Sequence, residues 1–323
     1  MSAAAIPARR TRHRHLAGLG AFVALLGAAA AGLGVFARGN GSFVTVSSVR
    51  GEIYEMATSG VYANNALQVV AEGVGWDVFT LLVAAPAMLV ATVVMARGSY
   101  RATLVVTGLF GYFAYLHLEY AVTWAFGPLF PAFVVLLAAS VIGLIGSGSL
   151  LAAAGLVGRF DDRFPRRAWA TLSLGMSALL FVMWTGRIVE ALRATGAGQL
   201  HGHTTMTVQA LDLGLVVPIA VVIAVAALRR RGAAEVAASA FVVTFAAMSA
   251  AIMAMMISSW IVTGIPAVEP IVIFGFAALA SLAVGARMFR SLVPVPSERP
   301  TPEANRSIGR MDALALRGMG GGR

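Results

Sequence analysis

Long apolar stretches, separated by short polar breaks, dominate the pattern along the chain. A helix that crosses a bilayer needs about 20 mostly apolar residues. The pattern therefore predicts an all-α protein, a polytopic transmembrane helix bundle of about eight spans. The expected spans cover residues 16–37, 76–96, 102–123, 130–152, 168–190, 206–228, 236–262 and 269–288.

The spacing of polar residues divides the chain into three parts. They are a basic N-terminus over 1–15, the bundle over 16–290 with an outer loop at 38–75, and a tail over 291–323. Within the loop, residues 43–46 indicate a strand, and the helical spacing of apolar positions over 62–72 predicts a short helix on the outer face. The tail is rich in Pro, Arg and Gly, which predicts disorder.

Composition narrows the class of protein further. The chain is 59% apolar and 12% charged, and it has no cysteine. Too few polar side chains remain to cover a water-facing surface, which excludes a soluble enzyme and a disordered protein. The lack of cysteine excludes disulfides, zinc–thiolate sites and iron–sulfur clusters. No Walker loop, dinucleotide fingerprint or nucleophile elbow is present, so we predict no cofactor.

The basic residues, all of them arginine, give a formal net charge of +10. If the N-terminus is cytoplasmic, 20 of the 24 arginines fall on the cytoplasmic side, as the positive-inside rule expects. The sequence thus predicts a multi-pass protein of the bacterial plasma membrane with both termini in the cytoplasm. The expected partners are the lipid bilayer and anionic lipid at the cytoplasmic face, and no nucleic acid.

The first span follows a basic segment and could be read as a signal peptide with a cleavage site at 29–31. Its apolar run of about 20 residues exceeds the usual 7–15 of a signal sequence, so an uncleaved anchor is the favoured interpretation.

The second and sixth spans share a pattern that suggests a 4+4 parallel repeat. Each has an aspartate before a proline, Asp77 with Pro86 and Asp212 with Pro218, and each ends at arginine. Trp124 and Trp260 follow the two aspartates after similar intervals. Parallel repeats occur in transport proteins. The alternative is that proline and tryptophan collect at membrane interfaces in any bundle.

Ionisable groups inside a bilayer are costly, so each is a functional candidate. With the N-terminus inside, most of them lie in the outer third of the bundle, which suggests a polar pocket open to the outer face. The candidates for this pocket are Asp77, His117, Glu119, Arg187, Glu190, Gln209 and Asp212.

Spacing indicates which of these candidates share a helix face. Glu119 lies on one stripe with two tyrosines of its span, whereas His117 points toward Tyr120 and Trp124. Arg187 and Glu190 can pair, and the simpler interpretation of that pair is a structural contact. Gln209 and Asp212 share a face.

Asp77, at the expected start of the second span, could be only a helix cap. Asp212 lies past the first turn, where a capping role explains less. The sequence therefore favours Asp212 and Glu119 as the most informative acids.

His201 and His203, with Met206 nearby, form the one cluster that suggests a metal, since imidazole and thioether suit copper. The alternative is that both histidines are solvated in a polar loop.

The segments 76–86, 97–99, 111–115 and 211–218 together resemble a family of uncharacterised bacterial multi-span integral membrane proteins. The resemblance covers about half of the chain and implies a fold but no activity. A tyrosine-rich stretch in the third span of that family is interrupted here by His117 and Glu119.

Three functions fit these observations. The first is a small-solute or ion permease with a polar pocket at the outer face. The second is an accessory or assembly protein without catalysis, which would contact a protein partner through loop 38–75. The third is a membrane-bound redox or other enzyme subunit with an acid–histidine site.

Overall fold

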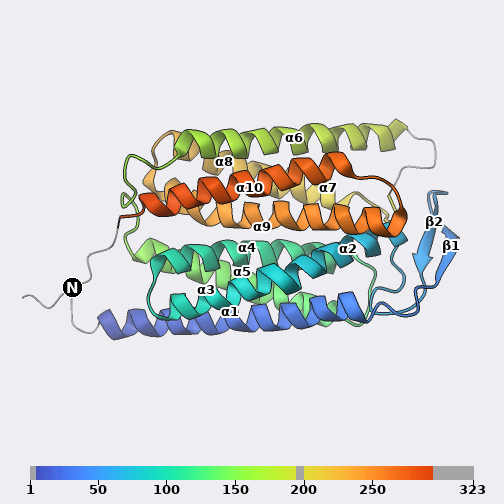
Figure 1. The fold of residues 1–323 in the computed structure, drawn as a ribbon, viewed down its shortest axis with the longest axis horizontal. Coiled ribbons are helices and arrows are strands. Elements are labelled where there is room, and N and C mark those ends of the chain that lie inside the picture. The colour runs from blue at the N-terminus through green and yellow to red at the C-terminus, as the bar shows by residue number, and fades with distance from the viewer. Residues whose placement is uncertain (1–4, 194–199, 294–323) are drawn as a thin grey trace, which may run out of the picture.

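A computed structural model describes residues 5–193 and 200–293 of the chain. Seven of the helices in these ranges are long and apolar enough to cross a membrane. They lie side by side along one direction (Figure 1). The protein is therefore an integral membrane helix bundle.

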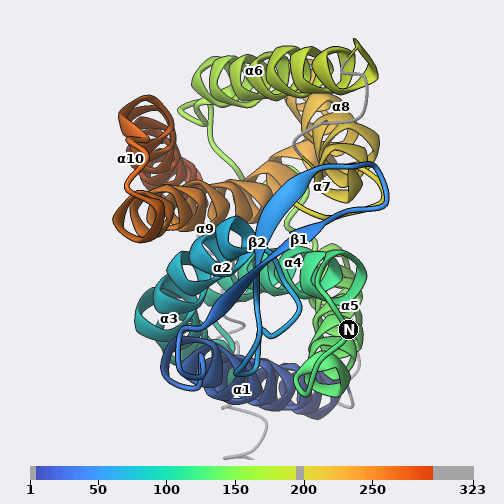
Figure 2. The same cartoon turned by 90° about the vertical axis from the view of Figure 1, so that its right-hand side faces the viewer.

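The described helices form two groups, which we call the first and second halves (Figure 2). The first half contains α1 (Ala5–Phe36), α2 (Leu67–Phe79), α3 (Ala85–Ala96), α4 (Tyr100–Thr123) and α5 (Phe130–Ala153). The second half contains α6 (Arg166–Arg193), α7 (Thr207–Leu211), α8 (Val217–Leu228), α9 (Gly232–Thr263) and α10 (Val268–Ser291).

The helices pack by the same scheme in both halves. In the first half, α1 and α4 each pack on α3 and α5. In the second half, α6 and α9 each pack on α8 and α10. The halves meet where α4 contacts α9, with α2 packed on α9 and α7 on α4. Helices α4 and α9 therefore form the centre of the molecule.

The expected third span, 102–123, is present as α4 but is not among the seven helices that qualify by length and apolarity. The expectation of eight spans therefore stays a prediction. Helix α4 is central and carries polar groups such as Thr107, Tyr112 and Glu119 on its buried surface.

Two boundaries differ from the sequence prediction. The separate outer helix predicted over 62–72 is wrong, because residues from Leu67 onward begin the second membrane-length helical unit, 67–96. The helix continues through Glu72 and Asp77 into the span, because no proline or turn sequence interrupts it there. Helix α1 likewise extends into the basic N-terminus, back to Ala5, since arginine is a good helix former.

Two spans contain a π-helical turn just before a proline. These turns are η1 (Thr80–Ala84), which ends two residues before Pro86, and η2 (Asp212–Val216), which ends two residues before Pro218. Proline has no N–H to donate, and its ring clashes with the carbonyl four residues earlier. The wider π turn accommodates the proline without ending the span.

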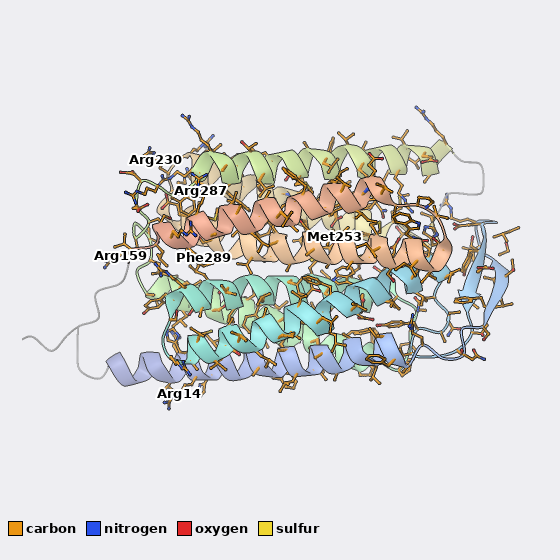
Figure 3. The ribbon with its side chains drawn as sticks, viewed as in Figure 1. Arg14, Arg159, Arg230, Met253, Arg287 and Phe289 are labelled. Carbon is orange, nitrogen blue, oxygen red and sulfur yellow. The ribbon has the colours of Figure 1, made fainter. Side chains whose placement is uncertain are left out.

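A β-hairpin lies at one end of the bundle. Strands β1 (Phe43–Ser47) and β2 (Ile53–Ala57) pair antiparallel, with Phe43 opposite Ala57. The strand predicted over 43–46 is therefore confirmed. The hairpin crosses from the first half toward the second (Figure 2). We call this the hairpin end and the opposite one the arginine end, where Arg14, Arg159, Arg230 and Arg287 lie (Figure 3).

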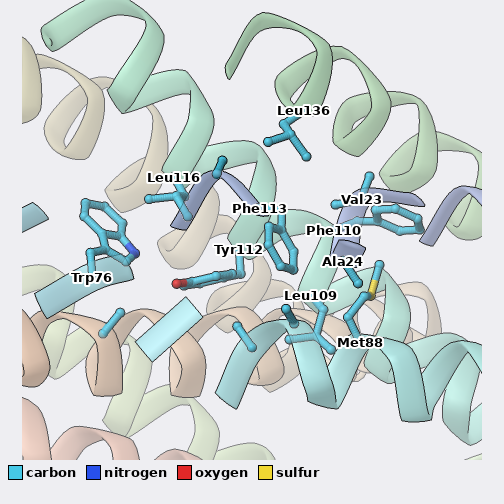
Figure 4. Packing of buried hydrophobic residues seen from close by; sticks show 14 of the residues in the cluster. Val23, Ala24, Trp76, Met88, Leu109, Phe110, Tyr112, Phe113, Leu116 and Leu136 are labelled. Carbon is cyan, nitrogen blue, oxygen red and sulfur yellow. The ribbon is translucent and has the colours of Figure 1, made fainter. Parts of the chain in front are cut away.

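The main buried cluster lies inside the first half. Trp76, Phe110, Tyr112, Phe113 and Met88 pack there at 2% exposure or less (Figure 4). A second cluster surrounds Trp169. Residues 294–323 of the predicted tail lie outside the described residues.

The halves approach each other most closely at glycines of the central helices. A Cβ at Gly75 of α2 would lie 2.3 Å from the carbonyl oxygen of Ala254 on α9. A Cβ at Gly108 of α4 would lie 2.3 Å from the carbonyl oxygen of Ala240, also on α9. Small residues let helix backbones approach where lipid supplies no hydrophobic driving force.

We expect Gly75→Ala to destabilise the contact between the halves by about 1–3 kcal/mol, because backbone must move to admit the methyl group. The matched control is Gly148→Ala on α5, where a Cβ would have no neighbour within 4 Å. Thermal unfolding of the purified protein should show a lower midpoint for Gly75→Ala and an equal or higher one for Gly148→Ala. Equal midpoints for both variants would contradict the close contact.

Candidate functional site

Two tyrosines of α4 reach the first residue of each π turn. The Tyr112 hydroxyl lies 2.7 Å from the Thr80 hydroxyl in η1. The Tyr115 hydroxyl donates a hydrogen bond of 2.5 Å to Oδ1 of Asp212 in η2. One central helix therefore contacts both proline-interrupted spans at the same point of each interruption.

Asp212 is held on both carboxylate oxygens. Its Oδ2 accepts a hydrogen bond of 2.8 Å from the indole Nε1 of Trp184 on α6, in addition to the bond from Tyr115. Asp212 is 9% exposed, and Gln209, one turn earlier, is 8% exposed. Both residues are therefore buried between the halves.

Asp77 forms a second buried carboxylate site. It is 2% exposed and lies well inside α2, so the interpretation as a helix cap is wrong. Tyr62, from the loop before α2, donates a hydrogen bond of 2.5 Å to Oδ2, and Tyr120 donates one of 3.2 Å to Oδ1. Burial and the neighbouring Asp77 raise the pKa of Tyr62, which keeps its hydroxyl protonated as a donor.

Glu119 differs from both aspartates because it lacks a hydrogen-bond partner. It is 8% exposed, and no other described residue hydrogen-bonds to its carboxylate. Asp212 and Glu72 both lie within electrostatic range of it. Glu72 itself accepts a hydrogen bond of 2.6 Å from Gln68. Three carboxyl groups from α2, α4 and η2 therefore surround one region between the halves.

His117 lies apart from this acidic region. Its Nδ1 is 2.7 Å from the carbonyl oxygen of Phe113, so Nδ1 carries the proton and donates. The ring contacts Phe113, Tyr120 and Phe133, in the direction that the spacing predicts. An acid–histidine pair between Glu119 and His117 is not formed.

Arg187 and Glu190 are not joined by a salt bridge. Glu190 is exposed, whereas Arg187 is half-buried and lies near Glu72. The Arg187 Nη2 atom is also 3.4 Å from Nε2 of His201. The arginine therefore links the acidic region to the loop that precedes α7.

The hairpin is fastened to this loop through Glu52. The Glu52 carboxylate accepts hydrogen bonds of 3.1–3.4 Å from the backbone N–H groups of Leu200, His201 and Gly202. Successive left-handed residues, His201 at φ +51° and Gly202 at φ +80°, aim these donors at one acceptor. We call this contact the Glu52 latch.

The metal site predicted at His201 and His203 stays a prediction. Within the described ranges, no group of three His, Asp or Glu side chains is arranged to hold a metal ion. The positively charged Arg187 beside His201 also opposes a bound cation. Burial lowers the pKa of both histidines, and Arg187 lowers that of His201 further.

Sequence reasoning identified Asp77, Glu119 and Asp212 but missed their partners. Trp184 lies one helical turn before Arg187 and could have been found from that spacing. Tyr62 belongs to a loop, and nothing local in the sequence indicates its contact with Asp77. Five of the predicted pocket residues are buried, at most 9% exposed: Asp77, His117, Glu119, Gln209 and Asp212. They do not form one group, because Asp77 and His117 lie apart from Glu119 and Asp212.

No protein-family model matches the chain, and no curated protein or solved structure does.

We expect Glu52→Gln to weaken the latch, because hydrogen bonds to a charged acceptor are worth about 1 kcal/mol more than those to a neutral one. Amide hydrogen exchange at residues 200–202 should become about fivefold faster. Glu55→Gln, at an exposed position of the same hairpin, is the matched control and should leave exchange unchanged. Unchanged exchange in Glu52→Gln would show that the latch contributes no stability.

The latch should also weaken in acid. The pKa values of His201 and His203 are lowered in the folded state, so the stability they contribute is present above about pH 6.5 and is lost as pH falls through their folded pKa values. Exchange at 200–202, corrected for its intrinsic pH dependence, should show less protection at pH 5 than at pH 8. The double variant His201→Gln, His203→Gln should flatten this dependence; the same slope in that variant would contradict a role for the histidines.

Proposed function

We propose that the protein is a small-solute or ion permease, with a proton-binding site at Glu119, near Glu72 and Asp212. The observation that carries the proposal is Glu119, a buried carboxyl group without a hydrogen-bond partner among the described residues. Asp77 and Asp212 are each held by two side-chain donors, whereas no described residue donates to Glu119, so its carboxylate is available to a ligand. A bound proton would neutralise its charge.

The position of the site supports the proposal. Glu72 belongs to the first half, Asp212 to the second, and Glu119 to the central helix α4. A ligand held there would contact both halves, so its binding would depend on how the halves pack. The sites of many transporters lie at such an interface between repeats, near interrupted helices.

We further propose that the halves are a parallel repeat. Each half has the same packing scheme, and α1 and α6 both run from the arginine end toward the hairpin end (Figure 1). Aligning Pro86 with Pro218 aligns η1 with η2 and places Asp212 opposite Thr80. This alignment differs by three residues from the one that pairs Asp77 with Asp212.

The proposed setting is the bacterial plasma membrane, with both termini cytoplasmic and eight spans. The arginines gathered at one end support this orientation, since cytoplasmic ends of membrane proteins are enriched in basic residues (Figure 3). The acidic site then lies closer to the outer face.

The test is proton flux through the purified protein in liposomes, with a pH-sensitive dye inside to report protons. We expect Glu119→Gln to lower the flux at least tenfold, because the neutral amide cannot bind and release a proton. Asp212→Asn should act in the same direction. Glu190→Gln, on an exposed acid of α6, is the matched control and should transport normally.

All three variants must elute as the unmodified protein does in size-exclusion chromatography, so that loss of flux is not loss of fold. Flux in Glu119→Gln equal to that of the unmodified protein would refute the site.

A second candidate function is that of an accessory protein that binds a partner through the hairpin. The observation in its favour is apolar surface on the hairpin: Val49 is 89% exposed and Ile53 is 74% exposed. Exposed apolar patches mark interaction sites. The test compares the double variant Val49→Ser, Ile53→Ser with Glu119→Gln in cells. If the double variant lost the protein's activity in cells and Glu119→Gln kept it, the accessory function would replace the permease as the proposed function.

A further inference from the structure

A groove runs along the membrane-facing side of the bundle, between α3, α4 and α10. It is a shallow, open groove with a volume of about 630 Å³. Its walls include Pro86, Val90 and Val94 of α3 and Phe289 of α10. From Pro86 to Val94 the groove extends about 12 Å along α3, at 1.5 Å per residue.

At its arginine end, the groove is lined by a charged side chain rather than by apolar ones. Arg101, in the first turn of α4, lines it there and is exposed. The Arg101 Nη2 atom donates a hydrogen bond of 3.1 Å to the carbonyl oxygen of Leu292, which fixes the guanidinium beside the groove. A guanidinium has five N–H donors, so others remain for a ligand.

We propose that this groove binds an anionic phospholipid, with one acyl chain along α3 and the phosphate on Arg101. The apolar walls suit a hydrocarbon chain, and a groove left unfilled would lose the dispersion contacts of its lining. Arginine binds phosphate through paired, charge-assisted hydrogen bonds. The arrangement of apolar walls with one fixed cation at the end matches the order of groups in a phospholipid.

The groove lies at the edge of the interface between the halves, because α3 and α4 belong to the first half and α10 to the second. Pro86, which follows the π turn η1, forms part of the wall. A lipid bound there would contact both halves on the side away from the hairpin. This placement makes the lipid a structural component of the interface rather than part of the bulk bilayer.

The experiment is native mass spectrometry of the full chain, equilibrated with equal amounts of phosphatidylglycerol and phosphatidylcholine of the same acyl chains. We expect the unmodified protein to retain phosphatidylglycerol about tenfold more than phosphatidylcholine. Arg101→Gln should lose this preference. Arg14→Gln, an exposed arginine at the same end but on α1, is the matched control and should keep it.

A second variant tests the apolar part of the groove. Ala87 is exposed and lines the groove, so Ala87→Phe fills it without disturbing the core. We expect Ala87→Phe to retain less phosphatidylglycerol than the unmodified protein, although Arg101 is still present in this variant.

Three results would overturn the proposal. The first is a lack of preference: the unmodified protein retains both lipids equally, or Arg101→Gln and Arg14→Gln retain phosphatidylglycerol to the same extent. The second is a dimer that Ala87→Phe dissociates, which would assign the groove to a second copy of the chain. The third is lipid retention that appears only after residues 294–323 are deleted, which would assign the groove to the chain's own tail.

Discussion

The hydrogen bonds that α4 makes to the two π turns are the contacts on which the arrangement of the bundle depends. A bilayer offers no water to a buried polar side chain, so each one needs a partner inside the protein. Tyr112 is the partner of the Thr80 hydroxyl, and Tyr115 is a partner of the Asp212 carboxylate. Helix α4 also contains Arg101, His117 and Glu119, which lower its hydropathy, and it is not among the seven helices that qualify as spans. A helix at the centre of the fold thus has a weak hydropathy signal.

Apolar periodicity predicted the class of fold and the approximate position of the helices, because a bilayer imposes a length and a polarity on every spanning segment. It failed at the start of α2, where residues 62–72 were assigned to a separate outer helix. Hydropathy marks where a segment is apolar, but the end of a helix also depends on the loop that packs against it. Here Tyr62 of that loop reaches the buried Asp77, a contact across 15 positions that no local pattern encodes.

Part of the candidate site could be predicted from the sequence, because the bilayer also limits charged residues within spans. Glu119 and Asp212 stood out because charge is rare within a span, and the structure places them near each other. Glu119 and Asp212 are far apart in the sequence, and Trp184 belongs to a third helix. That these residues lie together could therefore be learned only from the packing of the helices. The proposed repeat depends on which residues are aligned. Aligning Pro86 with Pro218 aligns the two π turns and leaves Asp77 and Asp212 three residues out of register.

The two halves differ in how much of their surface is covered. Buried side chains concentrate around Phe110 and Tyr112 of the first half, whereas α6 in the second half leaves Val182 69% exposed and Leu192 80% exposed. In a bilayer such residues face hydrocarbon at no cost. The second half contacts the first mainly through α9.

The Glu52 latch has a mechanical consequence for these halves. The hairpin is rooted between α1 and α2 and hydrogen-bonded to the segment before α7, so it joins the halves at the hairpin end. The hydrogen bond from Arg101 to Leu292 joins them at the opposite end. Separating the halves at either end therefore requires one of these two polar contacts to break first.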